Sequence, residues 1–257
     1  MSVIDVHHEV TGPEGAPVVV LSNSLGATLE MWDPQVAALA ERFRVVRYDT
    51  RGHGRSPAAQ GDSTIDDLAD DVLALLDRLR IGRAHVVGLS IGGMTGLRLA
   101  ARNPERVDRL VVLCSSAHPG NPDAWRDRAA TARSQGTGAL AEAVVGRWFT
   151  PAFAEAHPDL VARMRETIAA CDDEGYAGCC AAVGALDLRD QLDAITAPTL
   201  VISGADDPAL PPEHQGAIAA GIRGAALLTL SPAAHIANVE QPEHVTAALL
   251  AHLGGIR

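Results

Sequence analysis

The sequence predicts an α/β protein, with a mostly parallel sheet flanked by helices and a helical cap inserted before the last strands. Three observations lead to this prediction. Short runs of β-branched and aliphatic residues alternate with helical patterns through the first half of the chain. From Pro119 to about Leu188 the strand patterns stop, and only helix-like stretches remain. The alternation of strand and helix then returns in the last part of the chain.

The first half of the chain contains four strand patterns, expected at residues 18–21, 45–48, 85–87 and 110–113. A helix follows Thr64, which forms a candidate capping box with Asp67, and its apolar residues keep helical spacing up to Leu79. A second helix is expected from about Met94 to Arg102, where an Asn-Pro pair stops it. This alternation is typical of parallel βαβ units.

The middle third, residues 119–190, is expected to be a helical cap, because a structureless loop of that length is rare in a compact domain. The alternation returns with strands at 199–202 and 227–230 and helices at about 213–220 and 242–252. We therefore divide the chain into a core in two parts, 1–118 and 191–257, and a cap, 119–190.

Composition excludes several classes of function. The chain has 257 residues, 47% of them hydrophobic, and a formal net charge of −11, which argues against a nucleic-acid partner. The four cysteines show no zinc-ligand spacing and are expected to be buried thiols. No signal peptide and no apolar run of about 18 residues is present, so we expect a cytoplasmic protein that does not interact with a membrane. The oligomeric state is left open.

The segment Gly88-Leu89-Ser90-Ile91-Gly92 has the G-x-S-x-G pattern of a nucleophilic serine. It lies between an expected strand and an expected helix, which is the strand–turn–helix setting that this motif requires. Glycines on both sides allow the tight turn that exposes the serine hydroxyl. The backbone N–H of Ile91 then lies at a helix N-terminus, where it can stabilise an oxyanion. Ser90 is therefore the candidate nucleophile.

A serine hydroxyl needs a base, and the base needs a carboxylate to orient it. In folds with this motif the chain order is serine, acid, histidine. Asp207 is the candidate acid, because the usual pattern is G-x-x-D followed by a proline, although Asp206 remains an alternative. His235, in a loop after the last strand, is the candidate base. The second oxyanion donor is expected to be the N–H of Leu25, in the loop after the first strand.

From end to end the chain resembles the 3-oxoadipate enol-lactonases, which belong to the α/β-hydrolase superfamily. Related hydrolases share several of the matching segments, but two segments of the cap and the replacement of the common His-Gly by Asn-Ser are more specific. The matching segments are 22–26 with Met31-Trp32, 49–56, 88–93, 147–150, 175–182 continuing to 187–189, 204–211, and His235.

This resemblance implies hydrolysis of 3-oxoadipate enol-lactone to 3-oxoadipate in protocatechuate and catechol catabolism, through an acyl-enzyme and without a cofactor or metal. The substrate carries a carboxylate, so an overall acidic protein needs a local cation in its pocket. Arg147 beside Trp148 is the first candidate for substrate binding, with Arg133 or Arg189 as further candidates, and Ser24 is expected to contact the substrate as well. Arg147 could equally be a solvated helix residue, with Trp148 packing the cap onto the core.

Other functions fit the same motif. Another small-ester or lactone hydrolase, a cofactor-free perhydrolase or haloperoxidase, or a carbon–carbon bond hydrolase would keep the three catalytic residues and change the cap. A ligand-binding receptor on a hydrolase scaffold would keep the residues with little turnover. Covalent labelling of the serine separates an enzyme from a receptor, and direct assay of the enol-lactone separates the hydrolases.

Overall fold

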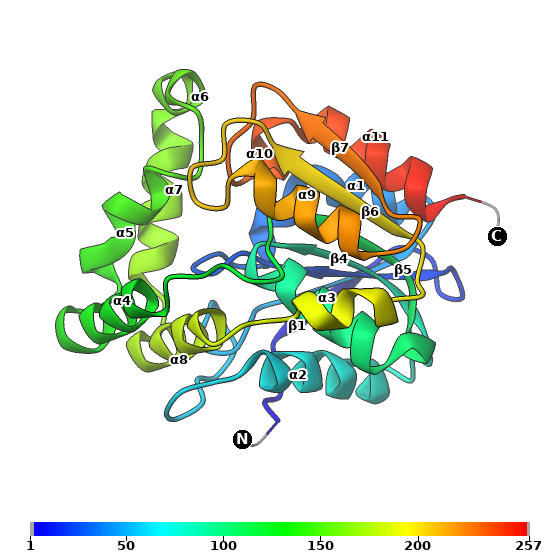
Figure 1. The fold of residues 1–257 in the computed structure, drawn as a ribbon, viewed down its shortest axis with the longest axis horizontal. Helices are drawn as coiled ribbons and strands as arrows, with labels where there is room; N and C mark the ends of the chain where they lie inside the picture. Colours follow the sequence, from blue (N-terminus) through cyan, green and yellow to red (C-terminus); the bar gives the residue numbers. More distant parts are fainter. Residues whose placement is uncertain (1–2, 256–257) are drawn as a thin grey trace.

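The computed structural model describes residues 3–255, which form one seven-stranded sheet with helices on both sides and a helical cap at one end (Figure 1). The strand order is β1-β3-β2-β4-β5-β6-β7. Within residues 3–255, only the pairing of β1 with β3 is antiparallel. The strands are β1 (His8–Thr11), β2 (Val18–Ser22), β3 (Arg44–Tyr48), β4 (Ala84–Leu89), β5 (Val107–Leu113), β6 (Thr199–Gly204) and β7 (Ala226–Leu230). The expected fold class is confirmed.

Two layers of helices cover the sheet (Figure 1). On one side α1 (Asp33–Ala40) packs against α11 (Pro242–Leu253). On the other side α2 (Ile65–Arg78) packs against α3 (Ile91–Arg102), and α9 (Pro212–Gly221) lies along β6 and β7. The central strand β4 is buried along its whole length, as expected for a parallel strand covered on both faces.

Local signals in the sequence account for most helix boundaries. The Thr64–Asp67 capping box is present at the start of α2, as predicted. The helix after the serine begins at Ile91, earlier than the expected Met94, because the turn at Ser90 leads directly into it. The short elements β1 and α1 were not predicted. Each is too short to show a clear hydrophobic period, and β1 is only partly covered.

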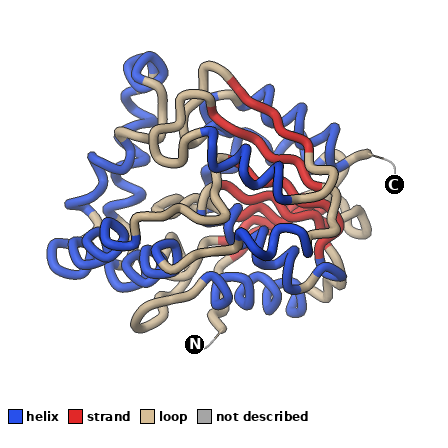
Figure 2. The backbone as a smooth tube through the Cα atoms, in the orientation of Figure 1, coloured by secondary structure: helices blue, strands red, loops and turns tan. Residues whose placement is uncertain are grey.

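Between β5 and β6 the chain leaves the sheet and forms five α-helices, followed by a short 3-10 helix. Figure 2 shows these helices gathered at one end of the stacked strands. They are α4 (Pro122–Gln135), α5 (Gly138–Val145), α6 (Pro151–Ala156), α7 (Pro158–Ala169) and α8 (Asp173–Gly184). Within the cap α4 packs on α8 and α5 on α7. Side chains of Asn121, Thr150 and Asp172 cap the N-termini of α4, α6 and α8.

The register of the parallel strands aligns their carboxyl ends beneath the cap. Ser22 at the end of β2 lies opposite Gly88 of β4, and Leu89 lies opposite Leu113 of β5. Loops that follow these strands therefore meet at one edge, where open α/β sheets bind their ligands. No helix among residues 3–255 is long and apolar enough to cross a membrane.

Candidate active site

Ser90 occupies a strained turn between β4 and α3. Its backbone has φ 57° and ψ −119°, a conformation that L-residues rarely adopt. The turn requires glycine at two neighbouring positions. A Cβ at Gly88 would collide with the carbonyl of Gly92, and a Cβ at Gly92 would collide with the carbonyl of Ser22. The Ser90 carbonyl also accepts a hydrogen bond of 2.7 Å from the Ser115 hydroxyl. The serine is thus presented at the tip of a rigid elbow.

Asp207 and His235 follow β6 and β7 and meet in a buried contact. Nδ1 of His235 lies 2.8 Å from Oδ2 of Asp207, and both side chains are at most 5% exposed. The other carboxylate oxygen, Oδ1, accepts hydrogen bonds from the N–H groups of Ala209 and Leu210 at 2.8 and 3.1 Å. Because the carboxylate can only accept, Nδ1 carries the proton and Nε2 is left with its lone pair free to act as a base.

Asp206, the alternative acid, has a different partner. Its Oδ2 accepts a hydrogen bond of 3.2 Å from the backbone N–H of Ala233, in the loop that leads to His235. The geometry therefore gives Asp207, and not Asp206, the contact with the histidine.

Ser90 and His235 line the same narrow cavity, which encloses about 50 Å³ between the core and the cap. The loop after β2 contributes Ser24 and Leu25 to its wall. The cap and neighbouring elements supply apolar surface from Met94, Val144, Val183, Ala209 and Leu210, aromatic surface from Trp125 and Trp148, and two cations, Arg128 and Arg147. This lining of apolar and aromatic surface with two cations suits a small molecule that carries an anionic group.

The two candidate oxyanion donors, Leu25 and Ile91, lie in the wall of the Ser90 cavity and directly after Ser90 in the chain, respectively. Ile91 is the first residue of α3, so its N–H has no acceptor within the helix. The loop that carries Leu25 is joined to the elbow by a hydrogen bond of 3.0 Å from the N–H of Gly92 to the carbonyl of Asn23. Within residues 3–255, neither Ile91 nor Leu25 has a protein acceptor for its N–H. These two groups form the candidate oxyanion hole.

The substrate-binding candidates from the sequence do not all reach the cavity. Ser24, Arg147 and Trp148 line it. The guanidinium of Arg133 instead binds Glu174 and Asp62 at 2.8–2.9 Å, on the exterior of the cap. Arg189 is exposed and bound to Asp187.

Arg128, which the sequence analysis missed, does line the cavity. Its guanidinium donates two hydrogen bonds to the Tyr176 hydroxyl, one of them 2.9 Å long, and stacks 5.1 Å from the Trp125 ring centre. The spacing of Trp125 and Arg128, three residues apart on a helix, is the only signal that the sequence offers for this pair.

The described residues give less support to a cysteine nucleophile or a metal site. All four cysteines are buried, and burial raises the pKa of each thiol, to about 12 for Cys171 and about 11 for Cys180. Protonated thiols of this kind are poor nucleophiles. In residues 3–255 no three His, Cys, Asp or Glu side chains gather where they could hold a metal ion.

The sequence profile of the alpha/beta hydrolase fold matches residues 17–242. The chain belongs to the α/β-hydrolase family. This α/β hydrolase is 40% identical to 3-oxoadipate enol-lactonase 2 of Acinetobacter baylyi, over 93% of its own length and 90% of the relative. It is 35% identical to RutD of Variovorax paradoxus, which is named as a carbamate hydrolase, over 98% of its own length and 97% of that relative.

Among solved structures, this α/β hydrolase is similar to the enol-lactonase from Burkholderia xenovorans LB400. The two share 45% identity and a TM-score of 0.96, and the match covers 98% of this chain and 97% of the other. The resemblance to the enol-lactonases that the sequence suggested is confirmed, and this α/β hydrolase is a carboxylic-ester hydrolase.

Proposed function

We propose that this α/β hydrolase opens 3-oxoadipate enol-lactone to 3-oxoadipate, a step in the catabolism of aromatic compounds, and that Ser90, His235 and Asp207 carry the reaction. The observation that carries the proposal is the pair of cations beside the serine. Arg128 and Arg147 line the same cavity as Ser90, and among residues 3–255 neither guanidinium is paired with a carboxylate. Cations without a counterion suit a substrate that brings its own carboxylate.

The two arginines also influence each other. The Arg147 side chain is exposed overall, yet desolvation and then the positive charge of Arg128 lower its pKa. A bound carboxylate would relieve this repulsion. Trp148 packs beside them with only 3% of its surface exposed, so its ring forms a fixed wall of the cavity.

The proposed reaction uses these groups in turn. Oγ of Ser90 attacks the lactone carbonyl while Nε2 of His235 takes the hydroxyl proton, and Asp207 stabilises the imidazolium that forms. The N–H groups of Leu25 and Ile91 stabilise the tetrahedral oxyanion. Collapse breaks the ring ester bond, and the enol oxygen leaves with the proton from His235 and tautomerises to the ketone. Water, deprotonated by His235, then attacks the acyl-enzyme and releases 3-oxoadipate with Ser90 regenerated.

The test compares substrates. We expect the enol-lactone, followed by loss of its ultraviolet absorbance, to react with a kcat/KM at least tenfold above that of p-nitrophenyl acetate, which has no carboxylate. Brisk ester or carbamate turnover with no reaction of the lactone would contradict the proposed substrate. Absence of any turnover, with no fluorophosphonate labelling of Ser90, would contradict the nucleophile.

Alanine variants test the role of the two cations. Arg128→Ala and Arg147→Ala are each expected to raise KM for the lactone about 10- to 100-fold, because a hydrogen bond to a charged group contributes about 1.5–3 kcal/mol. Hydrolysis of the uncharged ester should change little. Arg133→Ala is the matched control, since this cap arginine is bound to Glu174 and Asp62 instead. Equal effects of all three variants, or an equal loss with both substrates, would show that Arg128 and Arg147 do not bind the substrate carboxylate.

A further inference from the structure

The tip of the loop that carries Leu25 is held by a histidine from another loop. The N–H of Gly26 donates a hydrogen bond of 2.9 Å to Nε2 of His53. Gly26 has φ +87° and lies in a turn closed by a hydrogen bond of 3.1 Å from the N–H of Ala27 to the carbonyl of Ser24. The acceptor on His53 is therefore one peptide away from the candidate oxyanion donor, the N–H of Leu25.

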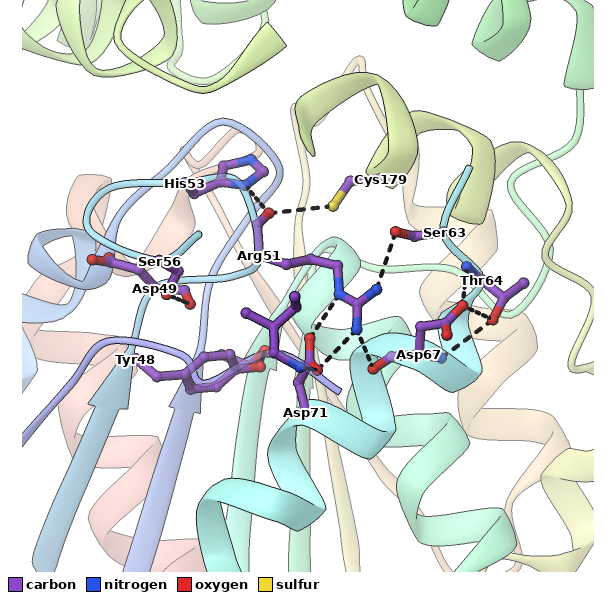
Figure 3. Close-up of polar contacts among 12 residues, drawn as sticks. Tyr48, Asp49, Arg51, His53, Ser56, Ser63, Thr64, Asp67, Asp71 and Cys179 are labelled. Carbon is purple, nitrogen blue, oxygen red and sulfur yellow. Dashed lines mark hydrogen bonds and ion pairs between the residues drawn. The ribbon is translucent and has the colours of Figure 1, made fainter. Parts of the chain in front are cut away.

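The orientation of His53 is fixed from its other ring nitrogen. Nδ1 lies 2.9 Å from the carbonyl oxygen of Arg51, which can only accept, so the proton is on Nδ1 and Nε2 is an acceptor (Figure 3). The Arg51 side chain is in turn anchored by buried hydrogen bonds of 2.7 and 2.8 Å to Asp71 of α2. With exposures of 1% and 3%, this ion pair holds the turn rigidly against the core.

Burial favours the neutral form of the His53 ring. The residue is 1% exposed, and burial lowers its pKa, while the charges of Asp49 and Asp172 act in the opposite direction. The ring of Tyr176 from α8 of the cap covers it, with ring centres 5.9 Å apart. A protonated ring would direct a second N–H at the N–H of Gly26, so the hydrogen bond exists only in the neutral form.

Two further bonds tie the same loop to the end of β3 and to the turn that follows it, but away from the tip. The Asn23 side chain donates a hydrogen bond of 2.7 Å to the carbonyl of Tyr48, and the N–H of Leu29 donates one of 2.9 Å to Asp49. Figure 3 shows Asp49 and His53 on one continuous turn together with Arg51. Of these three anchors, only His53 reaches the residue next to Leu25.

We infer that His53 is a positioning residue of the oxyanion hole, whose neutral Nε2 holds the Gly26 peptide and thereby sets the Leu25 N–H at its place beside Ser90. This inference rests on the proposed roles of Ser90 and Leu25. Displacement of a catalytic group by about 1 Å can cost 100-fold in rate, and loss of one oxyanion donor costs about 100- to 1,000-fold. The bond to Gly26 is thus expected to affect kcat while leaving the substrate cavity in place.

Two substitutions separate the two hydrogen bonds of His53. In His53→Asn the shorter amide can still donate to the Arg51 carbonyl but is too short to reach Gly26. In His53→Gln the longer amide can present its oxygen to the Gly26 N–H. With p-nitrophenyl acetate we expect His53→Asn to lower kcat about 10- to 100-fold with KM nearly unchanged, and His53→Gln to recover activity to within about fivefold of wild type.

A transition-state readout distinguishes positioning from a general loss of structure. A boronic acid forms a tetrahedral adduct on the serine, so its inhibition constant should rise by the same factor as kcat falls in His53→Asn and recover in His53→Gln. A purely structural role would impair both variants alike and lower both unfolding midpoints together. That result, or an Asn variant as active as wild type, would overturn the inference.

The readout is also independent of the natural substrate. A wild-type protein that hydrolyses the ester but not the enol-lactone would contradict the proposed substrate. The comparison of wild type, Asn and Gln variants on the ester would still decide the role of His53.

Discussion

At the scale of a single residue, Ser90 is held in a strained backbone conformation that presents its hydroxyl. A backbone in this region costs on the order of 1–3 kcal/mol and persists only when its surroundings determine it. Three features hold the strained backbone here. They are the two flanking glycines, the hydrogen bond of 3.0 Å from the Ser90 N–H to the Leu113 carbonyl, and the hydrogen bond from the Ser115 hydroxyl to the Ser90 carbonyl. All of these contacts come from the core, so residues of the core hold the serine turn.

The acid of the catalytic set can be tested by exchanging a single atom. Asp207→Asn is expected to lower kcat about 1,000- to 10,000-fold, because an amide can donate to Nδ1 and favour the wrong tautomer of His235. Asp206→Asn is the matched control and should cost less than tenfold, since its carboxylate contacts a backbone N–H. Steady-state kinetics at saturating ester measures both. A larger loss for the Asp206 variant would reverse the assignment.

Some of the site residues could be predicted from the sequence and others could not, for a physical reason. Ser90, Asp207 and His235 each follow a strand, and the carboxyl ends of parallel strands meet at one edge, so their proximity follows from chain order. Arg128 and Arg133 lie five residues apart on the same helix, and which of them faces the cavity depends on how α4 packs against α8. No local pattern encodes that rotation, so Arg128 could not be predicted as the cation that α4 places in the cavity.

Among the secondary-structure elements, the long ones with a clear period were predictable and the short ones were not. Helix α2 carries both a capping box and a regular apolar face, so its start was predicted at the right residue. Strand β1 covers four partly exposed residues and joins the sheet only by its antiparallel pairing with β3. Its existence depends on an available sheet edge, which is a tertiary property.

The end of β6 provides a test at this level. A Cβ at Gly204 would collide with the carbonyls of Ala233 and Ala234, which precede His235. Gly204→Ala is therefore expected to destabilise the protein by about 1–3 kcal/mol through overpacking and to lower kcat at least tenfold by displacing the histidine loop. Urea unfolding and ester hydrolysis measure the two effects.

The control for this substitution is Gly216→Ala in α9, where a new Cβ would have no heavy atom within 4 Å. Removal of a glycine from a helix interior should stabilise the protein by about 1 kcal/mol and leave kcat unchanged. Should Gly204→Ala retain both stability and activity, the close contact between β6 and the histidine loop would not constrain the site.

For the whole molecule, the buried neutral His53 links stability to pH. Burial lowers its pKa below the ordinary 6.5, so below pH 6.5 the unfolded chain binds a proton that the folded protein does not. The contribution of His53 to the free energy of unfolding is therefore fully present above pH 6.5, and it is lost as the pH drops toward the lowered pKa. Urea unfolding between pH 7.5 and 5 should show a smaller loss for His53→Gln than for wild type.

Other titrating groups are common to both proteins and cancel in this comparison. One of them is His252, whose pKa burial also lowers. Parallel curves for wild type and variant would mean that His53 does not resist protonation in the folded state.

The place of the cap in the chain has a consequence for biosynthesis. The nucleophile lies before the cap, whereas the acid and the base lie after it, in the loops that follow β6 and β7. A ribosome therefore completes the serine elbow and the whole cap before it has made the groups that activate the serine. We therefore expect the nascent enzyme to have no hydrolase activity until the loops after β6 and β7 are in place. We likewise expect a chain cleaved within the cap to be inactive unless its two fragments reassociate.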